Sequence, residues 1–309
     1  MVARLARSLA SASGPVPPGQ IWIGDDAAVL ERPEGRLVLA TDAVVEGVHV
    51  DLALVSPSDA GWKAMAAALS DIGAMGARPL HALVTIGAAA GTDVDGVVAG
   101  VAEASAHWGC PVVGGDLSTA PVLVISVAVS GVLDGDAPAV TRGGARPGDV
   151  LAVTGPLGSS AAGLRTLRGG WSGAGVAADG SGAALVLAHR RPKARLAEGL
   201  VARTAGATAM IDVSDGLALD LHRLADASGV GLDLQRIPVA PGATISEALG
   251  GGEDYELVVA TADPRGLEVA FDAAGLGPPI VIGSCVGDPA RRVLDGEPLA
   301  RSGWQHRLG

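Results

Sequence analysis

Single aspartates stand at the ends of short apolar stretches of this chain, and these side chains are the ones that could carry chemistry. Five segments, IGDDA, LATDA, LSDIGAMGA, VVGGDLS and MIDVSDG, each place a carboxylate beside Gly, Ser or Thr. Mg²⁺ takes octahedral oxygen ligands, usually one or two carboxylates together with phosphate oxygens and water. Several ions would therefore need aspartates from several segments. The candidates are Asp25, Asp26, Asp42, Asp71, Asp116, Asp212 and Asp215.

The same aspartates also have a structural explanation, because Asp beside Gly, Ser or Thr favours turns and helix N-caps. Their repetition in five similar settings favours one shared site over five independent caps. Such a site suits phosphate chemistry, since two like charges about 4 Å apart repel by about 4 kcal/mol at an effective dielectric constant of about 20. Two phosphate groups brought together for transfer need neutralising cations.

Other ways of binding nucleotides and metals are not supported by the sequence. A Walker loop, GxxxxGK[ST], is excluded because Lys63 and Lys193 are the only lysines and neither follows a glycine. The DGD segment at 134–136 lacks the rest of an EF-hand loop, which disfavours calcium. The six histidines have no paired spacing with cysteine, which disfavours zinc. Any nucleotide is therefore expected to bind through magnesium.

Length and charge limit the class of protein. A chain of 309 residues exceeds the usual size of one domain, so two domains are expected. A formal net charge of -11 argues against nucleic acid and anionic membranes as partners, because both require a basic surface. Cys110 and Cys285 lie far apart and outside any CxxC, which is typical of a reducing compartment. The sequence shows neither a signal-peptide core nor an apolar run of about 18 residues, so we expect a soluble cytoplasmic protein.

Short runs rich in Val and Ile predict strands, and the stretches between them predict helices. The alternation predicts an α/β fold with α+β character. The domains are expected to be 1–136 and 137–309, because Gly and Pro cluster between 134 and 148. The predicted strands are 37–41, 83–86, 122–132, 150–154, 231–234 and 256–260.

Two helices have clear ends in the sequence. The first begins at Ser56, a good N-cap. Asp71 lies off its apolar stripe, which is formed by Trp62, Met65, Leu69, Ile72 and Gly76. The second is expected over 214–228, with Gly229 ending it. The segment 168–182 is nearly all Gly, Ala and Ser, and it is expected to form a mobile surface loop or lid.

Glycine-rich segments carry further candidates. Gly114 and Gly115 precede Asp116, so the backbone could approach a phosphate while the carboxylate takes a metal. Arg142 could clamp a phosphate, although a surface arginine at a domain junction fits equally well. Three glycines and two acids at 250–254 leave room for a ligand.

Seven motifs occur in the order and spacing of the thiamine-monophosphate kinases: GDDAAV, TDAVVEGVH, KAMAAALSDIGAMGA, GGD, TRGGARPGDVLAVTG, MIDVSDGLALDL and GGEDYEL. The chain resembles this family, which is part of the aminoimidazole ribonucleotide synthetase superfamily, over nearly its whole length. The resemblance implies a two-domain fold of the aminoimidazole ribonucleotide synthetase type. It implies that the N-terminal domain binds ATP and magnesium and dimerises through its sheet, and that ATP lies at the junction of the domains.

The resemblance also implies a kinase reaction, in which the γ-phosphate of ATP passes directly to the phosphate of thiamine monophosphate. That acceptor is already anionic, so neither a general base nor a covalent nucleophile is expected. The implied ligands of several Mg²⁺ ions are Asp26, Thr41, Asp42, Asp71, Asp116, Asp212 and Asp215. The implied ATP contacts are Gly115, Asp116, Arg142 and Ser214. The residues implied to face thiamine monophosphate are His49, Glu253 and Trp304, whereas Asp25 is expected to be a structural neighbour.

Trp304 suits this substrate physically, because a flat aromatic face attracts a thiazolium cation. A tryptophan that covers the core is the alternative interpretation. The chain departs from the family pattern at Ala40, Ala68, Leu117, Ser118 and Gln305. These departures are compatible with the loss of one metal contact or its replacement by water.

Two alternatives stay open. One is another ATP-using synthetase of the superfamily, which would work through a phosphorylated intermediate. Selenophosphate synthetase, one such enzyme, would need a reactive cysteine near the N-terminus, but the first cysteine here is Cys110. The hydrogenase maturation factor, another, would need a C-terminal cysteine, but the last residue here is Gly309. The other is a non-catalytic homologue that binds nucleotide or metal, for which Ala40 and Ala68 are the support.

Overall fold

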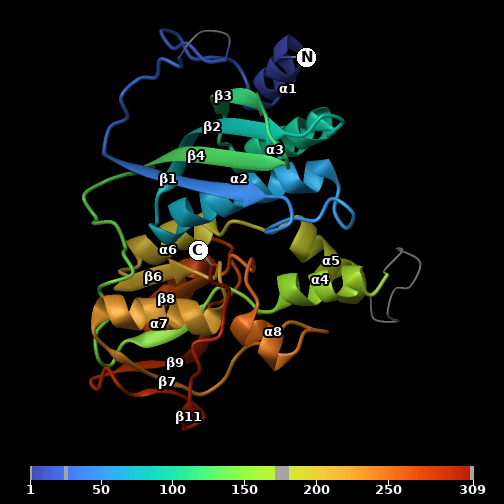
Figure 1. Ribbon diagram of the computed structural model, residues 1–309. Coiled ribbons are helices and arrows are strands. Elements are labelled where there is room, and N and C mark those ends of the chain that lie inside the picture. The colour runs from blue at the N-terminus through green and yellow to red at the C-terminus, as the bar shows by residue number, and fades with distance from the viewer. Residues whose placement is uncertain (1, 24–26, 171–180, 307–309) are drawn as a thin grey trace. The chain divides into compact units, whose positions relative to one another are not determined.

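The computed structural model describes residues 2–23, 27–170 and 181–306, and the chain forms two compact units (Figure 1). The N-terminal unit comprises Met1–Ile72 and Ala77–Asp136, and the C-terminal unit comprises Gly73–Gly76 and Ala137–Gly309. Each unit has its own sheet and its own helices. No helix within the described residues combines the length and the apolar character needed to cross a membrane.

The N-terminal unit is built on a four-stranded sheet of order β1-β4-β2-β3. β2 and β3 are parallel, and the other neighbours are antiparallel. The parallel pair is joined by the crossover helix α3 (Val94–Trp108). The strands are β1 (Arg36–Val45), β2 (Arg78–Ala88), β3 (Val112–Thr119) and β4 (Val124–Leu133).

Two helices cover one face of this sheet, while α1 (Val2–Ser13) packs against α3. Buried Val84 and Ile86 alternate in β2 with exposed residues, which is the pattern of a strand with one covered face. α2 (Pro57–Ala74) and α3 approach closely, because a Cβ at Gly61 or Gly100 would overlap main-chain atoms of the facing helix. Small residues therefore allow the close helix contact expected of a chain with few aromatics.

The start of α2 confirms the predicted N-cap at Ser56. The hydroxyl of Ser56 accepts a hydrogen bond from the N–H of Asp59 at 3.1 Å, and the Asp59 carboxylate accepts one from the N–H of Ser56 at 3.2 Å. The predicted stripe was too narrow, since Ala66 and Ala68 on the other faces are also buried. Gly76 lies beyond the helix end, in a left-handed conformation with φ 65°.

The C-terminal unit has a seven-stranded sheet of order β11-β10-β7-β9-β5-β8-β6, in which β10 and β7 are parallel and the other neighbours antiparallel. Helices cover both faces of the central part of this sheet. All five residues of β8 are therefore buried. The strands are β5 (Val150–Val153), β6 (Ala209–Asp212), β7 (Gly231–Leu234), β8 (Leu257–Thr261), β9 (Ile280–Val286), β10 (Arg292–Leu294) and β11 (Glu297–Pro298).

Helices supply both covering layers. Leu217, Leu221 and Leu224 of α7 pack on one face, and Leu267 and Phe271 of α9 pack on the other. The helices are α4 (Ser159–Arg168), α5 (Ser181–Arg190), α6 (Leu196–Thr204), α7 (Leu217–Ser228), α8 (Ile245–Gly250) and α9 (Pro264–Ala273).

The α/β class and all six predicted strands are confirmed, and two expectations need correction. The second predicted helix begins at Leu217, because Gly216 has φ 126° and ends the preceding turn; Gly229 ends the helix as expected, with φ 67°. The Gly-Gly-Asp segment, which was not among the predicted strands, forms β3, paired with β2. Most of the predicted lid, 171–180, lies outside the described residues.

Candidate functional site

Three loops of the C-terminal unit meet through main-chain hydrogen bonds, and we call them the loop cluster: segments 212–216, 250–256 and 302–304. The carbonyl oxygen of Ser214 accepts from the N–H of Glu253 at 2.8 Å, and the carbonyl oxygen of Asp215 accepts from the N–H of Trp304 at 2.8 Å. Four residues expected to bind metal, ATP or substrate are thus held side by side.

The backbone of the loop cluster is strained where the segments cross. Glu253 has φ 66° and Tyr255 has φ 52°, a left-handed conformation that costs a non-glycine residue about 1–3 kcal/mol. A Cβ at Gly252 would lie 2.5 Å from the carbonyl oxygen of Ser214, so only glycine fits there. Strain of this kind is retained where the surrounding contacts determine the conformation, and it is common at functional sites.

Asp220 of α7 shapes the turn that carries Asp215. Its buried carboxylate accepts hydrogen bonds from the N–H groups of Asp215 at 3.1 Å and Gly216 at 3.2 Å. Burial raises the pKa of Asp220 to about 6, while the N–H of Asp215 and the guanidinium of Arg223 oppose the shift. Sequence reasoning missed Asp220; an acid in the first turn of a helix that follows Ser-Asp-Gly was the available signal.

Arg223 connects this support to the candidate metal ligand. Its Nη1 atom lies 2.6 Å from Oδ2 of Asp215 and 2.6 Å from Oδ1 of Asp220. Asp215 lies in the turn that precedes α7, and Asp220 and Arg223 lie in the first turns of the helix. Asp220 and Arg223 are three residues apart, so they share a helix face. The arginine therefore bridges a partly exposed carboxylate and a buried one.

Of the two acids after the glycines, Glu253 is the one with an exposed carboxylate. It is 22% exposed, and its Oε2 lies 3.8 Å from Nδ1 of His189. Asp254 faces inward instead, where it accepts hydrogen bonds from the N–H groups of Gly158 at 2.5 Å and Ser160 at 2.9 Å. Burial raises the pKa of Asp254 to about 6. Asp254 therefore supports the start of α4, and Glu253 stays the candidate ligand.

His189 of α5 was also missed by sequence reasoning. It is buried, and its Nδ1 lies 3.1 Å from the hydroxyl of Ser160 on α4. A single histidine at the end of a helix gives no signal that it will meet Glu253, because the two lie far apart in the chain. The contact brings α5 beside the carboxylate of Glu253.

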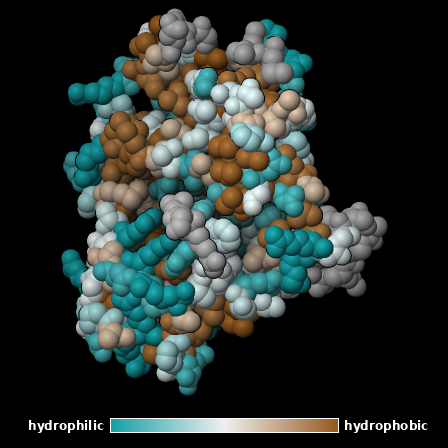
Figure 2. Space-filling model, viewed as in Figure 1, coloured by the Kyte–Doolittle hydropathy of each residue, from teal (hydrophilic) through white to brown (hydrophobic). Residues whose placement is uncertain are grey.

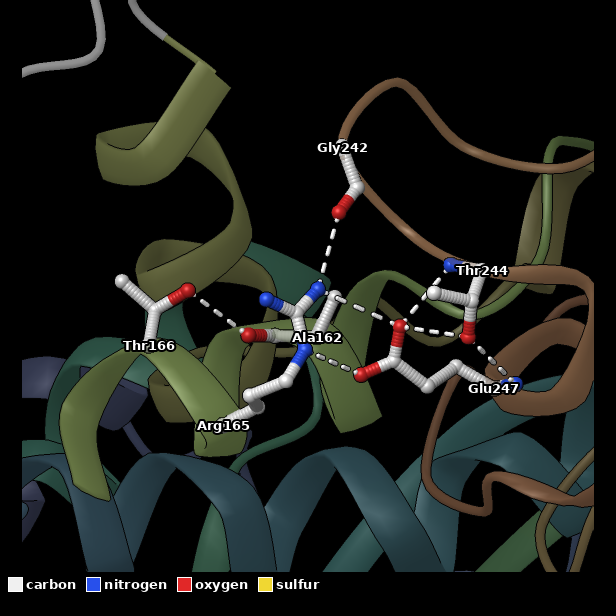
Figure 3. Close-up of polar contacts among 6 residues, drawn as sticks. All are labelled: Ala162, Arg165, Thr166, Gly242, Thr244 and Glu247. Atoms are coloured by element: carbon white, nitrogen blue, oxygen red, sulfur yellow. Dashed lines mark hydrogen bonds and ion pairs between the residues drawn. The ribbon is translucent and has the colours of Figure 1, made fainter. Parts of the chain in front are cut away.

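α8 anchors the glycine-rich end of the loop cluster (Figure 3). Its N-cap Thr244 and Glu247 form a reciprocal capping box, and Arg165 of α4 lies 2.7 Å from the Glu247 carboxylate through Nε. The hydrogen bond from Arg165 lowers the pKa of Glu247 below its usual value. The carbonyl oxygen of Glu247 in turn accepts from the N–H of Gly251 at 2.8 Å. α4 and α8 thus fix the position of the segment that leads to Glu253.

The segment that carries Trp304 is tied to α7 by charged groups. Asp226 of α7 pairs with Arg292 at 2.6 Å and with Arg301. His222 of α7 donates from Nε2 to the carbonyl oxygen of Leu299 at 2.9 Å and accepts at Nδ1 from Arg292 at 2.9 Å. Burial lowers the pKa of His222, so this neutral tautomer is favoured. The Trp304 side chain itself is 50% exposed, which contradicts the interpretation that it covers the core.

In the N-terminal unit, the predicted residues are spread across the sheet. Thr41 and Asp42 lie on β1 at one edge, and Gly115 and Asp116 lie on β3 at the other. Three strand spacings separate these edges, which is about 14 Å. Asp42 is in register with buried Val127, whereas Asp116 is in register with exposed Thr85, so the two carboxylates leave opposite faces of the sheet.

A cavity of about 1680 Å³ lies over the face of this sheet that α2 and α3 leave open. Thr41 and Gly115 line it, together with apolar side chains that include Trp22, Leu39 and Leu83. A Cβ at Gly115 would overlap the carbonyl oxygen of Val84. The close pairing of β3 with β2 therefore requires this glycine whether or not it contacts a phosphate.

The remaining candidates belong to other elements or lie outside the described residues. His49 follows β1, where its Nδ1 accepts a hydrogen bond from the N–H of Val45 at 3.1 Å. Asp71 is half-buried on α2. The carbonyl oxygen of Arg142 binds Ser228, at the end of α7 opposite Asp215 and about 18 Å along the helix. Asp26 and its neighbour Asp25 lie outside the described residues.

Magnesium fits the donors that are present. Within residues 2–23, 27–170 and 181–306, no three His, Cys, Asp or Glu side chains are grouped to hold a metal ion by themselves. An ion that keeps water and takes phosphate oxygens needs only one or two carboxylates, which is the habit of Mg²⁺. Asp215, which is partly exposed in the loop cluster, provides one.

Family models match both parts of the chain. The N-terminal domain of AIR synthase related protein matches residues 24–133, and the C-terminal domain of AIR synthase related protein matches residues 146–295. The fold and the matched domains define the class, which is that of the two-domain AIR synthase related proteins.

Similar proteins narrow this class. Thiamine-monophosphate kinase of Mycobacterium tuberculosis is 39% identical over 299 residues, which cover 91% of this chain and 84% of the relative. The crystal structure of thiamine-monophosphate kinase from Stenotrophomonas maltophilia is 32% identical, with a TM-score of 0.81 and 96% of each chain covered. AaThiL complexed with AMPPCP and TMP is 32% identical, with a TM-score of 0.78 and 92% of each chain covered. The chain belongs to the thiamine-monophosphate kinase family.

Proposed function

We propose that this protein transfers the γ-phosphate of ATP to thiamine monophosphate, giving thiamine diphosphate and ADP. The loop cluster is the observation that carries the proposal, because it gathers Ser214, Asp215, Glu253 and Trp304 through main-chain bonds. Ser214, Asp215 and Glu253 come from the motifs MIDVSDGLALDL and GGEDYEL, and the resemblance also assigns Trp304 to the substrate. The kinase family and the complex of AaThiL with AMPPCP and TMP support the same reaction.

The residues of the loop cluster suit positioning and charge neutralisation. The acceptor phosphate is an anionic nucleophile, so the reaction needs alignment of two phosphates and no proton acceptor. Magnesium, when bound, would neutralise the phosphate oxygens. Asp215 and Asp212 would hold it, and Ser214 would donate its hydroxyl to a phosphate oxygen.

Trp304 and Glu253 would recognise the organic part of the substrate. The exposed indole of Trp304 offers a face to the thiazolium cation, where a cation-π contact contributes about 0.5–2 kcal/mol. Glu253 adds a carboxylate near that cation. A neutral aromatic ring of similar shape would lack both attractions, which is a basis for selectivity.

The proposed assembly is a homodimer through the open face of the N-terminal sheet. Leu37, Leu39 and Leu83 on that face are 54%, 71% and 47% exposed. Figure 2 shows hydrophobic surface gathered over parts of the N-terminal unit. Apolar patches of this kind mark association surfaces.

The separation of Asp42 and Asp116 adds a constraint to the proposed metal binding. Carboxylates about 14 Å apart on opposite faces of one sheet cannot share an ion within one protomer. If Asp42 and Asp116 of the same protomer both bind magnesium, they bind different ions. The two buried free thiols, Cys110 and Cys285, support the cytoplasm as the compartment.

The test is the conversion of thiamine monophosphate by the full-length protein with ATP and Mg²⁺, with thiamine diphosphate measured by chromatography. Asp215→Asn is expected to lower kcat/KM roughly a hundredfold or more, because it removes a metal ligand. Asp272→Asn, on the exposed side of α9, is the matched control and is expected to retain activity. Absence of product with the intact protein would refute the kinase function and favour a non-catalytic homologue or another synthetase.

A further inference from the structure

An arginine lies on the carboxylate that the proposed function assigns to magnesium. Nη1 of Arg223 is 2.6 Å from Oδ2 of Asp215 and 2.6 Å from Oδ1 of Asp220. A guanidinium at this distance makes a charge-assisted hydrogen bond with each carboxylate. Asp215 is therefore neutralised by a cation of the protein itself.

The two ends of this bridge differ in burial. The side chain of Asp220 is 1% exposed and holds two main-chain N–H groups, so it cannot turn without breaking the Ser214–Gly216 turn. The Asp215 side chain is 26% exposed and that of Arg223 is 37% exposed. The contact with Asp220 is thus an anchor, and the contact with Asp215 is the one that another cation can replace.

A divalent cation must compete with Arg223 for Asp215. The cation and the guanidinium are both positive, so binding of the ion to this carboxylate requires the arginine to withdraw or to accept a nearby like charge. A free hydrated ion gains only protein carboxylates for this cost. An ion that arrives with nucleotide phosphates brings additional oxygen ligands, which offset the cost.

We propose that Arg223 is an internal counter-ion that competes with the divalent cation for Asp215 and weakens binding of the free ion relative to the nucleotide-bound ion. This inference rests on the proposed role of Asp215 as a magnesium ligand. Arg223 is a positioning residue, because it acts through Asp215. When the ion displaces it, Arg223 stays attached to Asp220.

The experiment measures binding of Mn²⁺, a paramagnetic substitute for Mg²⁺, to the full-length protein by electron paramagnetic resonance of the free ion. Without nucleotide, Arg223→Gln is expected to tighten Mn²⁺ binding roughly threefold to tenfold. With a non-hydrolysable ATP analogue present, the gain is expected to shrink. Arg291→Gln is the matched control, because Arg291 makes a similar 2.6 Å pair with Asp233 away from the loop cluster; its Mn²⁺ affinity should not change.

Asp215→Asn tests the metal role of Asp215 separately from the counter-ion role of Arg223. If this variant weakens Mn²⁺ binding and Arg223→Gln does not tighten it, the counter-ion inference is wrong and the metal site stands. If Asp215→Asn leaves Mn²⁺ binding unchanged, the metal role of Asp215 is wrong and the inference falls with it. Adding Arg223→Gln to Asp215→Asn should give no further gain.

Arg223→Lys keeps the test decisive should Arg223→Gln fail to fold. A lysine keeps the charge and can remain near Asp220, yet its side chain is shorter than that of arginine, so its ammonium group cannot take the position from which Nη1 contacts both carboxylates. Its Mn²⁺ affinity without nucleotide is expected to rise about twofold to threefold. Unchanged affinity in a folded Arg223→Lys protein overturns the inference.

Discussion

The main-chain N–H of Trp304 donates a hydrogen bond to the carbonyl oxygen of Asp215 at 2.8 Å. The bond joins the backbone of Trp304, whose side chain is 50% exposed, to the backbone of a candidate metal ligand far away in the chain. Gly303 makes the approach possible, because a Cβ there would lie 2.7 Å from the Cβ of Leu219 and 2.9 Å from the Asp215 carbonyl oxygen. The residue proposed for substrate recognition and the residue proposed for metal binding are therefore joined by one backbone contact.

Trp304→Ala should raise KM for thiamine monophosphate by roughly threefold to thirtyfold with a smaller change in kcat, since it removes a cation-π contact of about 0.5–2 kcal/mol. KM for ATP should stay near its original value. Steady-state kinetics with each substrate varied in turn will show the difference. Trp304→Phe keeps an aromatic face and should recover part of the affinity. An equal loss in both variants would contradict stacking as the role of Trp304.

Acid should destabilise the contact between α7 and the segment that carries Trp304. Burial and the charges of Arg292 and Arg301 lower the pKa of His222, whereas the Leu299 hydrogen bond and Asp226 oppose this. The unfolded chain therefore binds more protons than the folded one as pH falls from about 6.5 through the lowered folded pKa. The stabilising contribution is fully present above that window and is lost within it.

Thermal unfolding between pH 7.5 and pH 5 tests this dependence on His222. His222→Gln retains a donor toward Leu299 and does not titrate, so its Tm should fall less with acid than that of the unaltered protein. His306→Gln changes an exposed histidine and should not alter the profile. Equal acid sensitivity of all three proteins would show that another group governs the transition.

Gly115→Ala should lower the stability of the N-terminal unit by about 1–3 kcal/mol, because its Cβ would overlap the Val84 carbonyl oxygen and displace β3 from β2. Urea denaturation provides the free energy of unfolding. Gly277→Ala is the matched control, since a Cβ there meets no heavy atom within 4 Å. A fully stable Gly115→Ala protein would refute the requirement for close strand contact.

Leu39→Asp should convert the proposed homodimer into a monomer. Leu39 is 71% exposed in the isolated chain, so its replacement costs little folding stability but places a charge in the proposed interface. Sedimentation equilibrium gives the molecular mass. Val269→Asp changes a residue that is 61% exposed on α9 and should leave the mass unchanged. Dimers that persist in Leu39→Asp would exclude this face as the interface.

Local signals were sufficient for the elements with strong caps or continuous apolar strands. Ser56 marked the start of α2 and Gly229 the end of α7, because each satisfies terminal main-chain groups through its own geometry. β3 was missed because Gly114 and Gly115 have low strand propensity, and pairing with β2 imposes the extended form.

In the candidate site, too, some residues could be identified from the sequence and others only from the structure. Asp215 and Glu253 could be chosen from motifs and Trp304 from the family resemblance, since their residue types suit metal and cation binding. Arg223 and His189 could not, because their importance comes from contacts with those residues, and the only signal for Asp220 was its place in the first turn of a helix that follows Ser-Asp-Gly. A side chain that positions another one has no chemical signature of its own.

The sequence by itself determined the fold class, the family and the list of acidic candidates, because apolar alternation, caps and motif order are local properties of the chain. Only the tertiary structure decided which candidates meet. Strand order β1-β4-β2-β3 separates Asp42 from Asp116, although both follow apolar runs. Main-chain hydrogen bonds join Asp215 to Trp304 and Ser214 to Glu253, and such pairings depend on the packed sheet rather than on neighbouring residues.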